Sequence, residues 1–357
     1  MGRLEPTLQA PRPQRDHGFH LLGVSTVVRE TADAVSIVLD IPAGLAGTFS
    51  YRAGQFCNVQ VRIGGTPHMR CYSMSSAPEL GEAMALTVKR VPGGMVSNWI
   101  NDHLRAGDTV ELSPPSGFFQ LNETESDLVA FAAGSGITPV FSLVKTALAT
   151  TDRTLRLHDA NRGPTDVIFD AALGELERDY PGRLVVMRSY DTEHGLISPD
   201  TVAGFAGPSA PDGEFYVCGP GPYMQIVDEG LARLGVDPAR IHVERFTASD
   251  PIVGTPAPPP AAAAGATVTI ELEGRTETTD HHPGTTILQT ARQTGMSPPF
   301  SCESGSCATC MARLVEGAVS MYVNNALTPE EVEEGWVLTC QSVPTTPTVH
   351  VVYGLDD

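Results

Sequence analysis

The stretch FSCESGSCATC, residues 300 to 310, places three of the chain's seven cysteines within nine positions. They are Cys302, Cys307 and Cys310, and Cys340 follows the last of them after a gap of twenty-nine residues. Most residues between the three cysteines are small, and one is glycine, so the backbone can fold closely around whatever the thiols bind. Three thiols converge only if the chain wraps around them, and this stretch therefore decides the fold of the C-terminal part.

The spacing C-x4-C-x2-C with a distant fourth cysteine is typical of a plant-type ferredoxin cluster, in which two irons share four thiolates. Structural zinc is the main alternative, but zinc sites usually pair C-x2-C units or mix Cys with His, and neither pattern occurs here. A Rieske centre would need two His ligands, and the chain has no C-x-H. The sequence therefore predicts that Cys302, Cys307, Cys310 and Cys340 ligate a 2Fe-2S cluster.

The residues around these cysteines predict a small α+β module. Residues 266–274 (ATVTIELEG) and 275–280 (RTETTD) read as a hairpin, because apolar and polar residues alternate in the first run and Gly274 separates it from the Thr-rich second run. Residues 285–295 favour a helix with Thr285 near its N-cap, and residues 348–354 favour a closing strand.

Upstream of this module lies TPAPPPAAAAGA, residues 255 to 266, which carries no charge and cannot form a core. Its Pro-rich half favours a stiff, extended spacer of roughly 3 Å per residue. We therefore expect a linker over residues 249–266 and a 2Fe-2S ferredoxin domain over residues 267–357.

Two other patterns precede the linker, as expected for a 357-residue chain that is too long for one core. In residues 17–122, short alternating runs between Gly, Pro and Asp turns predict an antiparallel β-barrel. In residues 123–248, apolar strands alternate with helical stretches, which predicts an α/β domain with a parallel sheet. Residues 1–16 are expected to be disordered.

The composition excludes several classes of function. A net charge of −19 with only two lysines argues against a nucleic-acid partner. The first residues lack an apolar run and the longest apolar segment is broken by Gly and Pro, so we expect neither secretion nor membrane insertion, but a cytoplasmic protein with reduced thiols. Residues 267–357 carry a net charge of −9, which suits docking to a basic patch on another protein or serves solubility alone.

Two motifs in the β region suggest a flavin site. In RCYSMSS, residues 70 to 76, a cation for a pyrophosphate, a flat ring and a hydroxyl stand at a strand end. In GGMVSNWI, residues 93 to 100, glycines open a helix whose N–H groups can bind phosphate. Each motif alone is weak, because Tyr72 also suits a barrel core and Gly93–Gly94 also suits a plain turn.

Two motifs in the α/β region suggest a nicotinamide site. AAGSGITP, residues 132 to 139, follows a strand and opens a helix with Pro139 in its first turn, although it is not G-x-G-x-x-G. YVCGPGPYM, residues 216 to 224, ends a strand at Cys218, where a small polarizable side chain can pack on a nicotinamide. A buried cysteine before a Gly–Pro turn is the alternative.

In this order, RCYS, GGMVS, AAGSGITP, VCGPGP and HVERF resemble the ferredoxin–NADP reductase superfamily. With the cysteine loop added, roughly residues 18–355 are similar to the single-chain reductase components of bacterial oxygenases, which implies a β-grasp fold for the α+β ferredoxin domain. The resemblance implies residues that bind flavin (Arg70, Tyr72, Ser73), its pyrophosphate (Gly94, Ser97) and the nicotinamide dinucleotide (Gly134, Gly136, Thr138). It also implies a nicotinamide frame (Cys218, Gly219, Pro220), flavin neighbours (Glu244, Phe246) and a catalytic set of Ser73, Cys218 and Glu244.

The second phosphate site implies FAD rather than FMN. Asp159 follows the second α/β strand and would repel a 2′-phosphate, whereas Arg162 could pair with one, so NADH is favoured and NADPH stays open. The resemblance implies electron transfer from NADH through FAD and the cluster to a partner oxygenase, a Rieske-type ring or steroid hydroxylase. The alternatives are a di-iron epoxidase or desaturase as partner, or a non-catalytic iron–sulfur sensor or carrier.

Overall fold

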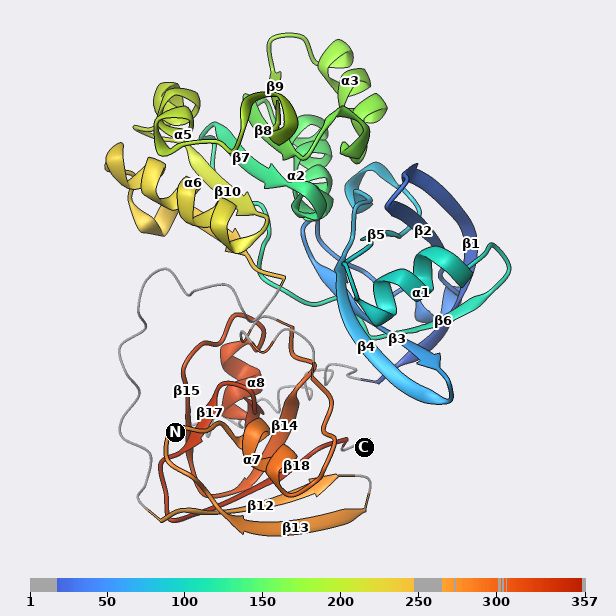
Figure 1. The fold of residues 1–357 in the computed structure, drawn as a ribbon, viewed down its shortest axis with the longest axis vertical. Coiled ribbons are helices and arrows are strands. Elements are labelled where there is room, and N and C mark those ends of the chain that lie inside the picture. The colour runs from blue at the N-terminus through green and yellow to red at the C-terminus, as the bar shows by residue number, and fades with distance from the viewer. Residues whose placement is uncertain are drawn as a thin grey trace, which may run out of the picture.

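The computed structural model describes residues 18–246, 265–272, 274–300, 303, 305 and 307–354 (Figure 1). The predicted disordered N-terminus, most of the predicted linker and Cys302 lie outside these residues. Within them, the chain forms a six-stranded antiparallel sheet, a five-stranded parallel sheet and a five-stranded mixed sheet. Short 3₁₀ turns lie at Ala43–Leu45, Pro78–Leu80, Gly134–Gly136, Pro164–Asp166, Gly207–Ser209 and Pro238–Arg240.

The first sheet forms the predicted β-barrel, with strand order β4-β3-β6-β1-β2-β5. Its strands are β1 (His20–Thr31), β2 (Ala34–Asp40), β3 (Phe56–Ile63), β4 (Thr66–Ser73), β5 (Ala85–Lys89) and β6 (Thr109–Leu112). A bridge between Met74 and Leu86 joins the end of β4 to β5 and closes the barrel. Helix α1 (Met95–His103) buries Val96 and Ile100 in the barrel core, so the helix start is held against the barrel end.

The second sheet is parallel, as predicted, with strand order β11-β10-β7-β8-β9. Its strands are β7 (Leu128–Ala133), β8 (Leu155–Asn161), β9 (Leu184–Tyr190), β10 (Glu214–Cys218) and β11 (Ile241–Glu244). The order reverses between β7 and β10, and a ligand of a parallel sheet binds at such a switch point, beyond the carboxyl ends of the strands. The predicted motifs at residues 134–138 and 218–220 follow these two strands.

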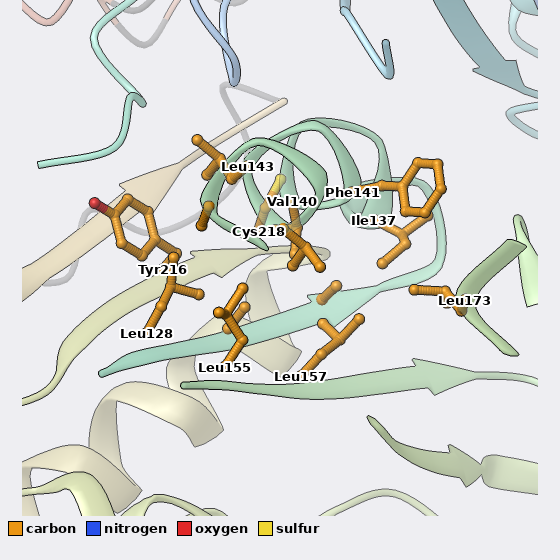
Figure 2. Packing of buried hydrophobic residues seen from close by; sticks show 14 of the residues in the cluster. Leu128, Ile137, Val140, Phe141, Leu143, Leu155, Leu157, Leu173, Tyr216 and Cys218 are labelled. Carbon is orange, nitrogen blue, oxygen red and sulfur yellow. The ribbon is translucent and has the colours of Figure 1, made fainter. Parts of the chain in front are cut away.

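Helices cover the parallel sheet. They are α2 (Ile137–Thr150), α3 (Asp170–Asp179), α4 (Asp191–His194), α5 (Pro199–Ala206) and α6 (Gly221–Arg233). Figure 2 shows Val140 and Leu143 of α2 in one buried cluster with Leu155, Leu157 and Cys218 of the sheet. Helix α5, which the sequence analysis did not predict, begins with a capping box between Ser198 and Thr201.

The C-terminal module has strand order β13-β12-β18-β14-β16, with a two-stranded sheet of β15 and β17 beside it. Its elements are β12 (Thr267–Leu272), β13 (Arg275–Asp280), α7 (Ile287–Gln293), β14 (Met311–Glu316), β15 (Val319–Met321), α8 (Pro329–Glu333), β16 (Trp336–Leu338), β17 (Ser342–Pro344) and β18 (Thr348–Val352). The predicted hairpin is β12 and β13, and the predicted closing strand, β18, lies in the middle of the sheet. Thr286, the residue after Thr285, caps α7.

No helix among the described residues is long and apolar enough to cross a membrane.

Candidate active site

The three described cysteines of the predicted cluster site lie together in the interior of the C-terminal module. Cys307, Cys310 and Cys340 are 3%, 2% and 6% exposed. A hydrogen bond with Cys340 and burial raise the pKa of the Cys310 thiol, and Cys307 lies close enough to add to the shift. The hydroxyl of Thr339 donates to the carbonyl of Cys310 at 2.7 Å, so the segment that carries Cys340 is tied to the cysteine loop.

The cysteine loop has a backbone that suits a bound inorganic group. Gly305 has φ +78°, and a Cβ there would lie 2.6 Å from the carbonyl oxygen of Val323. Glu303 and Ala308 also have positive φ, 50° and 54°, an uncommon conformation for residues with side chains. Arg292 holds the Glu303 carboxylate through two hydrogen bonds of 2.9 and 3.1 Å.

This loop fits a 2Fe-2S cluster, because soft thiolates converge in a dry loop whose glycine leaves no room for a side chain. Cys302, the remaining predicted ligand, lies outside the described residues. Within the part of the chain that the structure describes, no group of three His, Cys, Asp or Glu side chains is placed to hold a metal ion. The four-cysteine ligand set therefore stays a prediction at the level of individual residues.

The predicted flavin residues lie on β4, beside β3. Arg70 is exposed and donates to the carbonyl of Met69 at 2.7 Å, while Tyr72 packs against the barrel core and Ser73 is 3% exposed. Burial raises the pKa of Tyr72, so its phenol stays neutral.

Residues from all three modules meet at the end of β4. Ser73 lines a small cavity together with Glu244 and Phe246, which end and follow β11. The same cavity is lined by Cys71 and by Cys307 of the cysteine loop. Ser73, Glu244 and Phe246, three of the residues predicted to lie at the flavin, therefore share a cavity with one predicted cluster ligand, although they are far apart in sequence.

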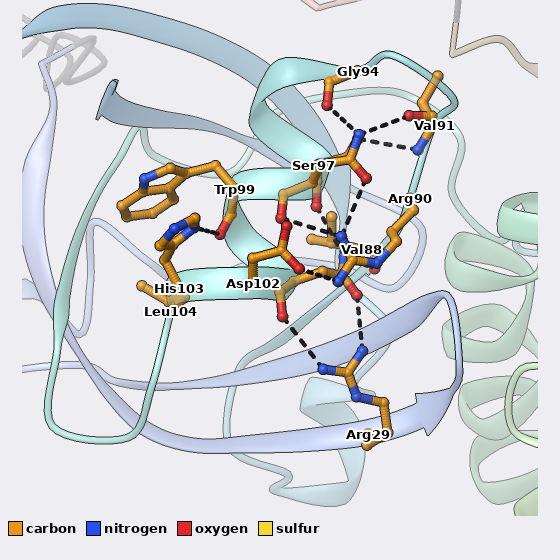
Figure 3. A network of polar contacts seen from close by, with 12 residues as sticks. Arg29, Val88, Arg90, Val91, Gly94, Ser97, Trp99, Asp102, His103 and Leu104 are labelled. Carbon is orange, nitrogen blue, oxygen red and sulfur yellow. Dashed lines mark hydrogen bonds and ion pairs between the residues drawn. The ribbon is translucent and has the colours of Figure 1, made fainter. Parts of the chain in front are cut away.

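The predicted phosphate loop precedes α1 (Figure 3). Ser97 accepts a hydrogen bond from the backbone N–H of Val91 at 3.1 Å, and the Asn98 amide donates to the carbonyls of Val91 and Gly94 at 3.0 and 2.6 Å. A Cβ on Gly94 would lie 2.7 Å from the Ser97 hydroxyl oxygen, so only glycine fits here without a shift. The loop thus holds the first N–H groups of α1 in place, and such groups favour an anion.

The predicted nicotinamide residues meet at the switch point of the parallel sheet. A Cβ on Gly136 would lie 2.1 Å from the carbonyl oxygen of Cys218, so the turns after β7 and β10 touch only because residue 136 is glycine. Thr138 donates to the carbonyl of Ser135 at 3.0 Å and stabilises the first of these turns.

The second of the two turns joins β10 to α6. Cys218 ends β10 in register with Glu244 of β11 and is fully buried. Gly219 follows it, and Pro220 occupies the N-cap of α6. The structure therefore brings the predicted residues on β7, β10 and β11 to one edge of the sheet.

Lys89 lies next to the predicted dinucleotide loop, and the sequence analysis did not predict it there. It ends β5 of the barrel, yet the Cβ position of Gly134 lies 3.4 Å from its Nζ. Burial lowers the pKa of Lys89, so part of its ammonium is out of water and close to the predicted dinucleotide loop. The only signal in the sequence was that Lys89 is one of two lysines, and its place depends on how the barrel packs on the sheet.

Asp159 does not lie beyond the second strand of the sheet, where the sequence analysis placed it, and that placement is wrong. Strand β8 runs on to Asn161, so Asp159 lies inside the strand and is 0% exposed, and burial raises its pKa to about 7. Arg162 follows the strand, but its guanidinium pairs with Asp33 at 2.7 Å and with Asp166 at 2.6 Å. The residue expected to repel a 2′-phosphate is enclosed, and the residue expected to attract one is already paired.

A flavin-type barrel, a dinucleotide-type sheet and a cysteine loop define an oxidoreductase that carries electrons through several cofactors. Known families match the same three parts. An oxidoreductase FAD-binding domain matches residues 23–121, an oxidoreductase NAD-binding domain matches residues 131–229, and a 2Fe-2S iron–sulfur cluster binding domain matches residues 270–345. The predicted fold class and the predicted cofactors FAD, NADH and 2Fe-2S are confirmed.

The chain is 37% identical to the ferredoxin reductase component of 3-ketosteroid-9-alpha-monooxygenase of Rhodococcus rhodochrous, over 95% of this chain and 97% of that protein. It is 32% identical to one of the subunits of the 1,2-phenylacetyl-CoA epoxidase of Escherichia coli, over 93% of this chain and 97% of that protein. The solved phthalate dioxygenase reductase shares the fold, with a TM-score of 0.59 and 22% identity over 94% of this chain and 98% of that one. The chain belongs to the ferredoxin–NADP reductase superfamily, as a single-chain oxygenase reductase with a C-terminal plant-type 2Fe-2S domain.

Proposed function

We propose that this chain is the NADH-dependent reductase component of an oxygenase system and delivers electrons from NADH to a separate terminal oxygenase. The observation that carries the proposal is the cavity in which Ser73, Glu244, Phe246 and Cys307 meet. A reductase of this kind needs its flavin next to its cluster, and these residues come from the three modules that would hold the two cofactors and the nicotinamide.

The residues would hold the cofactors as follows. The flavin would be contacted by Arg70, Tyr72 and Ser73, and its pyrophosphate by Gly94 and Ser97. The dinucleotide would be bound by Gly134, Gly136 and Thr138, and the nicotinamide would be framed by Cys218, Gly219 and Pro220. The irons would be ligated by Cys302, Cys307, Cys310 and Cys340. When bound, FAD supplies hydride acceptance with release of single electrons, and the cluster supplies one-electron carriage at low potential.

The protein's own part is to position and to exclude water. Tyr72 offers a neutral ring because burial keeps its phenol protonated. Lys89 would add positive charge beside the dinucleotide loop at Gly134. Ser73 and Glu244 are both buried, 3% and 8% exposed, and would shape the hydride-transfer site, since that step needs no general acid or base.

NADH is the proposed donor, because the two carboxylates paired with Arg162 leave that guanidinium poorly available for a 2′-phosphate. The proposed acceptor is a ring or steroid hydroxylase of the Rieske type, because one relative is the reductase component of a ketosteroid monooxygenase. The second candidate is a di-iron epoxidase, because another relative is a subunit of a phenylacetyl-CoA epoxidase. The reduced thiols suit the cytoplasm.

Anaerobic titration of the purified holoenzyme with NADH tests the proposal. The flavin and cluster absorption bands should bleach within the turnover time, and NADPH should act much more slowly. A passive sensor or carrier would bleach only over far longer times, and that result would remove the enzymatic function.

A further inference from the structure

A buried amide of the barrel contacts the cysteine loop of the C-terminal module. Asn58 lies on β3 and is 6% exposed. Its Nδ2 donates to the carbonyl oxygen of Cys307 at 3.2 Å, and its Oδ1 accepts from the hydroxyl of Thr309 at 2.6 Å. Thr309 is 8% exposed, so both hydrogen bonds are shielded from water.

The barrel holds this amide in one orientation. Ser113 accepts from the backbone N–H of Asn58 at 3.0 Å and from its Nδ2 at 3.3 Å. The thiol of Cys71 donates to Oδ1 at 3.0 Å. Because a carbonyl can only accept, the contact with Cys307 requires Nδ2 on that side, which leaves Oδ1 facing Thr309.

The contact lies where electrons must cross between modules. Phe56 packs with Cys307 and with Cys71 around the same point. Cys307 is at once a predicted cluster ligand and a wall of the cavity that contains Ser73 and Phe246. A shift of the cysteine loop away from Asn58 would therefore move the cluster away from the flavin site.

We propose that Asn58 and Thr309 form a reversible latch that docks the C-terminal module on the barrel with the cluster facing the flavin. The inference rests on the proposed function. Two hydrogen bonds between neutral groups are weak enough to open, which a module that must also reach a separate oxygenase requires. Asn58 and Thr309 are positioning residues, since both would act through the placement of Cys307.

Asn58→Leu removes both hydrogen bonds of the latch and Thr309→Val removes one of them, each with little change in size. The matched controls are Thr269→Val, which removes a hydroxyl bonded to Thr278 across a hairpin, and Gln60→Leu, which removes an amide two residues along β3 that bonds Glu111. In anaerobic stopped-flow with NADH, flavin bleaching should keep its rate in all variants. Cluster reduction should slow about tenfold in the two latch variants only, equivalent to about 1.4 kcal/mol.

Two further measurements separate docking from damage to the cluster. The cluster's midpoint potential and its electron paramagnetic resonance spectrum after full reduction should match wild type in Asn58→Leu and in both controls. Thr309→Val also removes the 3.1 Å contact between Cys307 Sγ and the Thr309 hydroxyl, so its rate of cluster reduction is compared with wild type after correction for its own midpoint potential. Alkylation of Cys71 in the holoenzyme, followed by peptide mass, should be several times faster in Thr309→Val, since Cys71 lies under the docked loop. The double variant should be no slower than Asn58→Leu alone, because Asn58 makes both hydrogen bonds of the latch.

An unchanged rate of cluster reduction in Thr309→Val or Asn58→Leu, in protein that is folded and fully loaded with cofactors, would overturn the latch. If one of the two variants loses its cluster or fails to fold, the other decides. Failure of the proposed function looks different, because wild type itself would then not reduce its flavin with NADH.

Discussion

The barrel makes two junctions that differ in kind. Toward the α/β module, the buried hydroxyl of Ser142 on α2 donates to the carbonyl of Ser76 at 2.5 Å. Ionic and charged contacts surround it, namely Lys145 with Glu82, Arg162 with Asp33, and Thr146 with Glu79. The glycine loop at Gly134 completes this junction against Lys89.

Toward the C-terminal module, the barrel makes polar contacts through Asn58 and Cys71, and these contacts join neutral groups. Beside them lies a cavity of about 740 Å³ lined by both modules, among them His68 and Arg70 of the barrel and Phe300 and Trp336 of the C-terminal module. Such an open junction suits reversible docking, whereas the ionic junction suits a fixed arrangement of the flavin and nicotinamide sites.

The largest effect should come from removing a cluster ligand, which tests whether electrons must cross the open junction. Cys340→Ser should abolish cluster-dependent reduction of a one-electron protein acceptor, while NADH-dependent reduction of ferricyanide persists, because a lost thiolate destroys the cluster without touching the flavin site. Iron content and both rates are the measurements. Cys57→Ala, at a buried cysteine of the barrel core, is the control and should keep its iron. Retention of cluster-dependent reduction in Cys340→Ser would show that electrons bypass this junction.

A steric change at the switch point should have the next largest effect. Gly136→Ala places a Cβ 2.1 Å from the carbonyl oxygen of Cys218, which should lower the free energy of unfolding by about 3 kcal/mol and raise the KM for NADH. Denaturant titration and steady-state kinetics measure both. Gly204→Ala is the matched control, since nothing lies near its Cβ position in α5, and it should be neutral or stabilising by about 0.5–1 kcal/mol. Slower cluster reduction with an unchanged KM would contradict the division between the junctions.

The modules and the motif order could be predicted because each rests on local pattern. Alternating strands, glycine turns and the cysteine spacing are properties of neighbouring residues, and the parallel sheet follows from alternation of strand and helix. The motifs at Gly136 and Cys218 could also be placed at strand ends, since one follows β7 and the other ends β10.

The junctions could not be predicted, because their partners are distant in sequence and meet only through packing. Nothing near Lys89 in the chain points to Gly134, and nothing near Asn58 points to Thr309. The burial of Asp159 was missed for a related reason. Strand length sets whether a polar residue lies at an edge or inside, and here β8 continues two residues past it.

The pH dependence of stability tests the enclosed carboxyl on the fixed side. Because the pKa of Asp159 is raised to about 7, the folded state keeps a proton that the unfolded state releases above its ordinary pKa near 3.8. Stability is therefore lost as pH rises from about 4 to 7, and Asp159→Asn should avoid that loss. We expect the gain of the variant to be about 3 kcal/mol larger at pH 8 than at pH 4.5, measured by thermal unfolding.

Two features keep this measurement clear. His158, next to Asp159, has a pKa lowered to about 4 by burial and adds its own pH dependence, but that contribution is the same in both proteins and cancels in the difference. Asp212→Asn, at an exposed carboxylate, is the control and should show no gain at either pH. An equal gain at both pH values would mean that Asp159 is not protonated in the folded protein near neutral pH.

The smallest expected effect concerns salt, and it compares the two junctions directly. Salt screens ion pairs, so raising NaCl from about 0.05 to about 0.5 M should reduce the contribution of Lys145 and Arg162 to stability. At low salt we put this contribution at about 1 kcal/mol for Lys145, which is largely enclosed. For Arg162, whose side chain is 60% exposed, we put it at about 0.5 kcal/mol or less. Lys145→Met and Arg162→Ala should therefore differ less from wild type at high salt than at low salt. The rate of cluster reduction should stay constant over the same range, because the contacts of Asn58 carry no charge. If that rate fell with salt in parallel with the stability difference, the docking of the C-terminal module would have to depend on charges outside Asn58 and Thr309, and the contrast between an ionic and a neutral junction would be wrong.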